Sequence, residues 1–225
     1  MISVIIPCLN EEKALPATLA NVFRQAGEYE IIVVDGGSTD RSCETVRNSP
    51  NVKLVRARCG RARQMNAGAD VARGDWLLFL HADTLLPENA LLRIASLSSE
   101  TDVQAGCFHQ KFSGGQRSLQ FISRLHNWRC NRTRIIYGDQ AMFVRRTLFH
   151  RLGGFPDRDI LEDVLFSEKL LQATRPLLLN ETVITDSRKF VQRGIFRCFA
   201  EVAIILICYE LRLPIMAPGF FSPVR

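Results

Sequence analysis

Two kinds of hydrophobic pattern alternate along the first part of the chain. Continuous apolar runs rich in Val, Ile and Leu are typical of strands buried on both faces of a sheet. These runs occupy residues 3–7, 30–35, 51–57 and 75–83. Helical spacing of apolar residues, or helix start signals, fill the intervals at residues 12–25, 38–46, 61–73 and 87–97. Strands separated by helices of this length predict βαβ units and a mainly parallel sheet, which is a Rossmann-like α/β fold class.

The second part of the chain is less regular. Its patterns predict strands at residues 105–113 and 140–146, and helices at residues 117–130, 147–152 and 162–173. Residues 176–187 read as either one long strand or a pair of strands. We find no internal repeat and no linker, so we expect a single domain over residues 1–225. It divides into parts at about residues 1–97, 98–190 and 191–225, the last a helical extension.

Polar residues gather where the predicted strands end. In open parallel sheets, ligands bind beyond the carboxyl ends of the strands, near a switch in strand order. This rule directs attention to residues 7–11, 35–40 and 81–84. The run LLFLHADT, residues 77–84, shows the contrast most sharply, because four apolar residues lead directly into a histidine and a carboxylate.

Acidic residues recur at these boundaries, as Asp35, Asp83 and the pair Glu162-Asp163. Each has a structural alternative, since Asp is common in turns and acids are favoured in the first turn of a helix. Together they predict transfer from a nucleotide-diphosphate donor. A diphosphate calls for a divalent metal held by one or two carboxylates, and a further carboxylate deprotonates the attacking hydroxyl.

Six sequence motifs strengthen this interpretation. In chain order they are SVIIPCLNEE, VVDGGSTD, GRARQMNAGADVARGDWLLFLHADT, YGDQAMFVRR, GGFPDRDILEDVLFSEKL and SRKFVQRG. They resemble the family 2 glycosyltransferases with the GT-A (nucleotide-diphospho-sugar transferase) fold, and they span residues 3 to about 195. The third motif is similar to that of a bacterial subgroup, the radical-SAM/selenodomain-associated glycosyltransferases.

The resemblance implies a metal-dependent, inverting, hexosyltransferase-type enzyme that uses Mg or Mn as its cofactor. It implies that Asp163, with Glu162, is the catalytic base and that Asp83 is the metal ligand. It also implies that Asp35 binds the nucleobase of the donor. Residues 1–97 would then form the nucleotide-sugar half, and residues 98–190 the acceptor half. The residues implied on the nucleotide-sugar side are Pro7, Asn10, Glu11, Asp35, Arg61, Asn66, Ala82, Asp83, Arg188 and Lys189. Those implied on the acceptor side are Gly138, Asp139 and Gln140.

Two positions leave alternatives open. His81 stands where many sugar transferases place the first Asp of an Asp-x-Asp motif. As a strand residue two positions before Asp83 it would share that face and ligate the metal, preferring Mn to Mg; otherwise it hydrogen-bonds a neighbouring loop. Phe190 replaces the Trp usual in the subgroup, which keeps an aromatic face but removes an indole donor.

Composition and the C-terminal segment bear on partners. The formal net charge is +6, which is compatible with anionic ligands, nucleic acid or an acidic membrane, but no nucleic-acid-binding module is present. The seven cysteines form no C-x-x-C pair and read as reduced thiols of a cytoplasmic protein. The apolar segment 198–208 fits a packed helix, a homodimer contact or an interfacial helix at a membrane, flanked by Arg193, Arg197 and Arg212.

Two further function classes are alternatives to a glycosyltransferase. A nucleotidyltransferase shares a similar core, but its first loop is usually glycine-rich and basic, whereas PCLNEE has no Gly and two acids. A non-catalytic nucleotide-sugar-binding relative would not need the Glu162-Asp163 pair. The sugar, the base and the acceptor, lipid-linked or small, are left open by the sequence.

Overall fold

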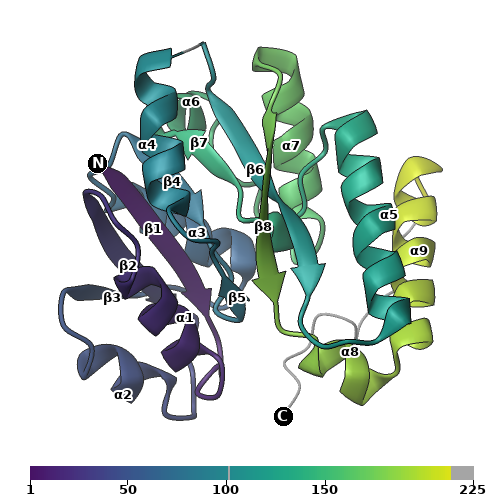
Figure 1. The fold of residues 1–225 in the computed structure, drawn as a ribbon, viewed down its shortest axis with the longest axis horizontal. Coiled ribbons are helices and arrows are strands. Elements are labelled where there is room, and N and C mark those ends of the chain that lie inside the picture. Colours follow the sequence, from purple (N-terminus) through teal and green to yellow (C-terminus); the bar gives the residue numbers. More distant parts are fainter. Residues whose placement is uncertain (101, 214–225) are drawn as a thin grey trace.

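A twisted eight-stranded sheet forms the centre of the molecule in a computed structural model, which describes residues 1–100 and 102–213 (Figure 1). The strand order is β3-β2-β1-β4-β7-β6-β8-β5. The strands are β1 (Ile2–Cys8), β2 (Tyr29–Asp35), β3 (Val52–Arg56), β4 (Trp76–Phe79), β5 (Thr84–Leu85), β6 (Ala105–Phe112), β7 (Phe143–Arg145) and β8 (Leu177–Thr185).

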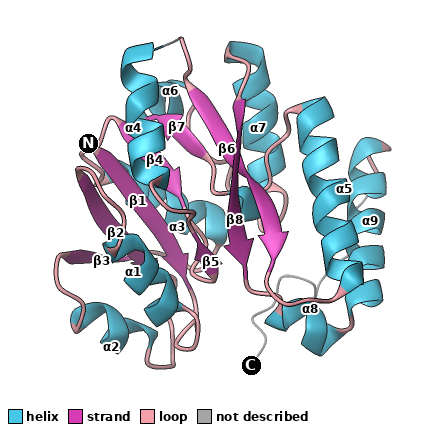
Figure 2. Ribbon diagram, in the orientation of Figure 1, coloured by secondary structure: helices cyan, strands magenta, loops and turns pink. Residues whose placement is uncertain are grey.

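Helices cover both faces of this sheet (Figure 2). They are α1 (Leu15–Phe23), α2 (Ser42–Arg47), α3 (Arg61–Asp70), α4 (Ala90–Glu100), α5 (Arg117–Thr133), α6 (Arg146–Arg151), α7 (Glu162–Ala173), α8 (Arg188–Arg193) and α9 (Ile195–Glu210), with a short 3-10 turn η1 (Gly138–Gln140). Leu19 of α1 and Ile94 of α4 belong to the core on one face. Met65 of α3 and Phe166 of α7 belong to the core on the other. Because both faces are covered, the strands need continuous apolar runs, as the sequence predicted.

The N-terminal strands pair in parallel. β1 lies between β2 and β4, and β2 pairs with β3. In this register Cys8 lies opposite Asp35, so the loops that follow β1 and β2 leave the sheet at one edge. The second part is mixed, because β7 is antiparallel to β4 and β6 while β6 and β8 are parallel. Residues 177–185 form one strand, which decides between the two expectations for that segment.

One expectation about the run LLFLHADT is wrong. The strand was expected to reach residue 83, but β4 ends at Phe79. Leu80 still donates its N–H to the carbonyl of Ile5, and the chain then turns, with the Thr84 N–H bonded to the His81 carbonyl at 3.1 Å. His81 and Asp83 therefore do not alternate as strand neighbours, and the argument that they share one strand face fails.

The C-terminal segment is helical, as expected. α9 lies beside α5 and follows α8 (Figure 1). One side of α9 is buried, with Cys198 and Ile205 each 3% exposed. No helix among the described residues is long and apolar enough to cross a membrane. The last part of the expected helical extension, residues 214–225, lies outside the described residues.

Candidate functional site

The loops after β1 and β2 are tied together by side chains. The Asn10 N–H donates to Ser38 Oγ at 3.0 Å, and Asn10 Oδ1 accepts the N–H of Thr39 at 2.8 Å. The Glu12 N–H donates to Asp40 Oδ2 at 3.0 Å. Asn10 itself has a φ of 56°, a left-handed conformation that Asn tolerates better than most residues. Two segments singled out from the sequence therefore form one rigid rim.

Asp35 ends β2 beneath this rim. It is 4% exposed, and its carboxylate accepts the N–H groups of Gly37 at 3.1 Å and Ser38 at 3.0 Å. Burial alone would raise the pKa of Asp35, but the bonds from Ser38 and Gly37 outweigh it, so the pKa lies below its ordinary value. Asp35 lines a cleft of about 530 Å³ together with residues that include Arg41, Arg47 and Arg56.

Gln64, which was not among the predicted site residues, binds the backbone at the same edge of the sheet. It is 4% exposed, and its Nε2 donates to the carbonyls of Cys8 and Val34, both at 2.8 Å. It thus links the ends of β1 and β2 through α3. An amide at helical spacing among apolar residues gives no sequence signal of such a role.

Asp83 lies in the turn after β4, close to a lysine of α8. Lys189 Nζ is 2.6 Å from Glu11 Oε1 and 3.5 Å from Asp83 Oδ2. Burial alone would lower the pKa of Lys189, but Asp83 and Glu11 outweigh it and raise the pKa above its ordinary value. Burial raises the pKa of Glu11 despite the lysine. Three residues predicted on the nucleotide-sugar side are thereby brought together.

His81 faces η1 and the start of α7. A Cβ on Gly138 would lie 2.7 Å from His81 Nε2 and 3.5 Å from Asp163 Oδ2. Any side chain at position 138 would therefore clash with the imidazole in its present position. Burial, with Arg61 and Lys189 nearby, holds the pKa of His81 well below its ordinary value, and the ring is neutral. Its Nε2 is buried and has no hydrogen-bond partner among the described residues.

Glu162 and Asp163 begin α7 and point to different partners. Asp163 accepts the N–H groups of Gly138 at 2.6 Å and Val164 at 2.8 Å. Glu162 is 2% exposed and pairs with Arg61, whose Nη1 lies 3.3 Å from its Oε1. Burial, opposed by Arg61 and reinforced by Asp163, raises the pKa of Glu162 to about 7. Arg61, expected beside the nucleotide, thus forms an ion pair with Glu162.

Asp139 completes a group of carboxylates around Gly138. Burial raises its pKa; His126 opposes this, and the charges of Asp163 and Asp83 add to it. His126, on α5, places its Nε2 3.7 Å from Asp139 Oδ1. His126 was not among the predicted site residues, since a lone histidine in a helix gives no sequence signal. Carboxylates from three distant segments therefore lie close enough to influence one another.

Four other predicted residues have structural roles in this conformation. Both polar atoms of the Asn66 amide bond the backbone of Phe155, at 2.8 and 3.0 Å. Gln140 is fully buried and accepts the N–H of Tyr137 at 3.1 Å. Arg188 is bound to Asp186, with 2.5 Å between its Nε and Oδ2. Ala82 is 3% exposed, and its carbonyl accepts Thr18 Oγ1 at 2.7 Å.

The donors near Asp83 bear on the expected metal. No group of three or more His, Cys, Asp or Glu side chains within the described ranges could hold an ion by itself. The Asp83 carboxylate offers the hard oxygen donor that Mg or Mn prefers, and Mg often binds through one carboxylate together with substrate phosphates. The residues therefore fit an ion that arrives with a diphosphate.

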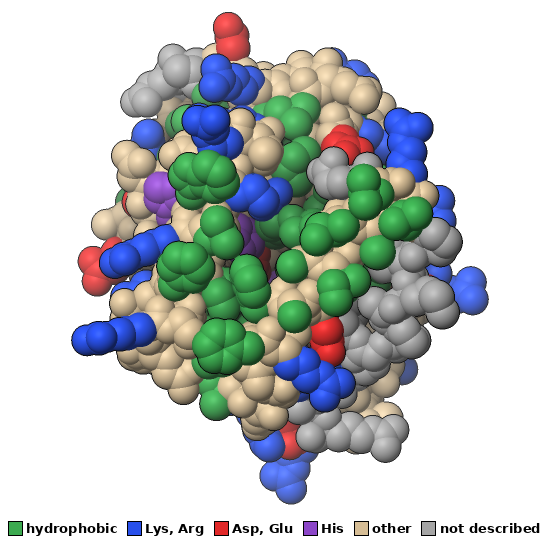
Figure 3. Space-filling view, turned by 90° about the vertical axis from the view of Figure 1, so that its right-hand side faces the viewer, with side chains coloured by type: hydrophobic (Ala, Val, Ile, Leu, Met, Phe, Trp, Pro, Cys, Tyr) green, Lys and Arg blue, Asp and Glu red, His purple; other side chains and the backbone are tan. Residues whose placement is uncertain are grey.

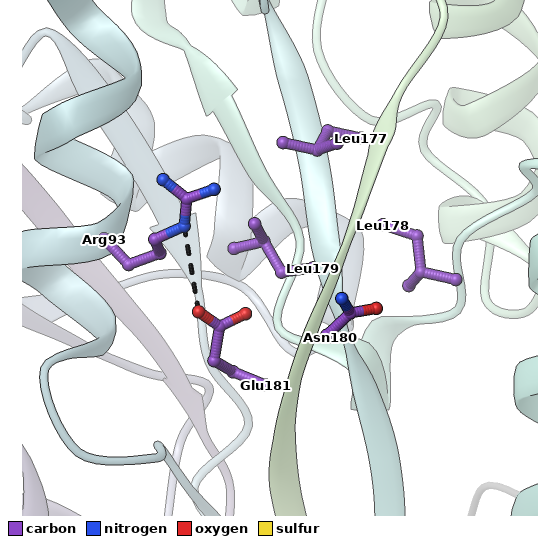
Figure 4. A pocket seen from close by; sticks show the side chains of 6 residues that line it. All are labelled: Arg93, Leu177, Leu178, Leu179, Asn180 and Glu181. Carbon is purple, nitrogen blue, oxygen red and sulfur yellow. Dashed lines mark ion pairs between the residues drawn. The ribbon is translucent and has the colours of Figure 1, made fainter.

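A second hollow lies away from these residues. Figure 4 shows it between α4 and the first half of β8, where Arg93 Nε lies 3.7 Å from Glu181 Oε1. Its volume is about 420 Å³, and leucines of β8 line much of it. It contains none of the predicted site residues.

Comparison with known proteins agrees with this arrangement. The family model of glycosyl transferase family 2 matches residues 3–153. A PGL/p-HBAD biosynthesis glycosyltransferase of Mycobacterium bovis (strain BCG / Pasteur 1173P2) is 36% identical over 170 residues, which are 69% of this chain and 63% of that relative. The chain thus spans less than two thirds of the length of this relative.

Solved structures show the same fold. The mannosyltransferase PcManGT from Pyrobaculum calidifontis, in complex with GDP-Man and Mn2+, superposes with a TM-score of 0.71 and 25% identity, covering 99% of this chain and 67% of its own. S. aureus TarS 1-349 in complex with UDP-GlcNAc gives 0.69 and 24%, covering 83% and 58%. The sheet, the loops at its edge and these matches together show that the chain has the GT-A fold and belongs to glycosyl transferase family 2.

Proposed function

We propose that this glycosyltransferase moves a sugar, with inversion, from a nucleotide-diphosphate sugar to a hydroxyl of an acceptor. The observation that carries the proposal is the grouping of three carboxylates: Asp163 bonds Gly138, Asp139 follows that glycine, and Asp83, with Lys189 beside it, lies close enough to raise the pKa of Asp139. One group of residues thus offers a base for the acceptor and a cation for the departing diphosphate. We further propose membership of the radical-SAM/selenodomain-associated subgroup, on the run GRARQMNAG followed by LLFLHADT.

The donor side is supported by the cleft and by the neighbours. PcManGT and TarS were solved with GDP-Man and with UDP-GlcNAc, both nucleotide-diphosphate sugars. In this chain the corresponding class of ligand would place its base at Asp35 and its diphosphate near Asp83, Arg188 and Lys189. The rim around Asn10 and Glu11 would contact the nucleotide between its base and its diphosphate.

Asp163 takes the acceptor proton as the hydroxyl attacks the anomeric carbon from the side opposite the leaving group. Its two bonds to backbone N–H groups fix the carboxylate, and Glu162 beside it is held by Arg61. The nucleotide diphosphate departs with the bonding electrons, and Lys189 and Arg188 would stabilise its negative charge. A divalent metal bound by Asp83 would add Lewis-acid stabilisation of that leaving group.

A ligand screen with two variants tests the proposal. Nucleotide sugars are added with and without Mn, and a donor that binds the folded state raises the melting temperature. We expect Asp83→Asn to lose the Mn-dependent part of that rise. Asp163→Asn should keep donor binding while sugar transfer falls by at least about a hundredfold, as expected for loss of a general base.

Asp70→Asn is the matched control, because Asp70 is an exposed residue at the end of α3. It should leave binding and transfer unchanged. Full transfer by Asp163→Asn would overturn its assignment as the base. A donor-induced rise that does not depend on Mn in the unmodified protein would overturn the metal at Asp83. The acceptor class, lipid-linked or small, the cytoplasmic location and homodimer formation stay predictions.

A further inference from the structure

Two helices at the edge of the molecule expose large apolar side chains. On α5, Phe121 is 64% exposed and Trp128 60%, with Leu125 between them at 39%. Their spacing places all three on one face of the helix. On α9, Phe196 is 82% exposed, Ile204 59% and Ile207 56%. Soluble monomers rarely expose so many large apolar groups together, so this face is expected to contact something.

The two apolar stripes lie on the same side of the molecule. α5 and α9 contact each other and run side by side (Figure 1). Figure 3 shows that side directly, with apolar side chains spread over it, Lys and Arg among and around them, and a hollow near the centre where histidine side chains are visible. We call this face, formed by α5 and α9, the apolar–basic face.

Its charge identifies the kind of partner. α5 carries four arginines and no acidic residue. Arg117 and Arg132 lie near the two ends of the apolar stripe, and Arg124 lies beside it; all three are exposed. The guanidinium of Arg132 is 5.9 Å from the centre of the Trp128 ring. On α9, Arg197 is paired with Glu201, so the excess positive charge is concentrated on α5.

We propose that the apolar–basic face docks on the surface of an anionic lipid bilayer, with its aromatic and aliphatic side chains at the level of the lipid headgroups. Amphipathic helices with aromatic residues on one side and basic residues beside them bind such surfaces, through buried apolar area and attraction to anionic lipid. A second copy fits less well, because pairing two such faces would oppose their α5 arginines. The inference does not depend on the donor or the reaction.

The face also adjoins the candidate site. His126 of α5 reaches Asp139 at 3.7 Å, and Arg129 of α5 stacks 3.7 Å from the centre of the Tyr137 ring. α8, which precedes α9, carries Lys189 to Glu11 and Asp83. Docking would therefore hold the site beside the bilayer.

Tryptophan emission provides a direct test with the full chain. Trp76 is 1% exposed and Trp128 60%, so a change in emission on binding reports Trp128. We expect vesicles of phosphatidylglycerol mixed with phosphatidylcholine to shift the emission to shorter wavelength and to carry the protein in a flotation gradient. Vesicles of phosphatidylcholine alone should bind much more weakly, and raised salt should release the protein.

Variants separate the contribution of apolar area to vesicle binding from that of positive charge. Phe196→Ser and Arg124→Glu should each weaken vesicle binding by roughly tenfold or more, from lost apolar area and reversed charge respectively. Phe23→Ser and Arg24→Glu are the matched controls, since both residues are exposed on or beside α1. They should bind vesicles like the unmodified protein, and melting curves should show that all four variants fold.

Several results would overturn the proposal. One is that the protein binds neither vesicle type, or binds both types equally well. Another is that the control variants weaken vesicle binding as much as Phe196→Ser and Arg124→Glu do. A third is that, without vesicles, the emission shifts to shorter wavelength as the protein concentration rises, with a doubled mass in sedimentation. That result would identify a second copy as the occupant.

Discussion

Carboxylates at the candidate site differ in what surrounds them. Asp35 accepts two backbone N–H groups, and its pKa is lowered. Asp139 is buried near other acids, and its pKa is raised. Glu162 is buried beside one arginine and one acid, and burial raises its pKa to about 7. Such divergence within one small region is typical of functional sites.

The raised pKa of Glu162 predicts how stability varies with pH. Its ordinary value is 4.5, so between about pH 4.5 and 7 the folded state binds the proton more tightly than the unfolded state does. The stability that Glu162 contributes is therefore greatest below pH 4.5 and falls as pH rises to about 7. The free energy of unfolding of the unmodified protein, minus that of Glu162→Gln, should fall by about 3 kcal/mol across this window.

Urea unfolding at a series of pH values measures this difference. Glu168→Gln is a suitable control, because Glu168 lies on the same helix and is exposed. Its difference from the unmodified protein should not vary over the window. A flat difference for Glu162→Gln as well would show that the folded environment does not perturb Glu162.

At the scale of the elements, β6 packs closely between an antiparallel neighbour, β7, and a parallel neighbour, β8. Gly106 of β6 pairs with Phe143 of β7 and with Leu177 of β8. A Cβ there would lie 2.4 Å from the Leu177 carbonyl oxygen and 2.5 Å from Phe143 Cζ. The first contact is with backbone, which cannot move aside as a flexible side chain can.

Gly106→Ala is expected to separate these strands and to lower the free energy of unfolding by about 3 kcal/mol, as overpacking does. Gly115→Ala is the control, because a Cβ at Gly115 meets nothing within 4 Å. It should change stability by less than about 0.5 kcal/mol. Urea unfolding curves compare the two, and equal stabilities would mean that β6 has room to shift.

At the scale of the whole molecule, segments far apart along the chain meet at the site. Lys189 lies 178 residues after Glu11 and donates to it at 2.6 Å. α8 therefore closes the site that the first strands begin, and the apolar–basic face continues from it through α9. The site and the proposed membrane surface share one part of the fold.

If Lys189 also binds the donor diphosphate, Lys189→Gln should weaken binding of a nucleoside diphosphate by about tenfold. Titration calorimetry with UDP and GDP measures this. Lys111→Gln, on the exposed side of β6, should bind normally. Unchanged affinity in Lys189→Gln would restrict Lys189 to neutralising Glu11 and Asp83.

Much of the fold was predictable because its signals are local. The continuous apolar runs predicted β1 to β4, although the fourth strand ended four residues early, and α7 was predicted at residues 162–173, as observed. Parallel strands that end in polar residues predicted that the loops around Asn10 and Asp35 would meet. Periodicity and turn chemistry act within a few residues, so they can be read from the chain directly.

Only the tertiary structure decided which side chains face one another. Arg61 pairs with Glu162 across 101 residues, a contact that its expected place at the nucleotide did not predict. His81 turns toward Gly138, and His126, with no signal of its own, reaches Asp139. The sequence by itself determined the strands, the helices and the edge where the site lies. The pairing of charges at that edge depends on contacts between residues far apart in the sequence. Such contacts produce no periodic pattern of residues along the chain.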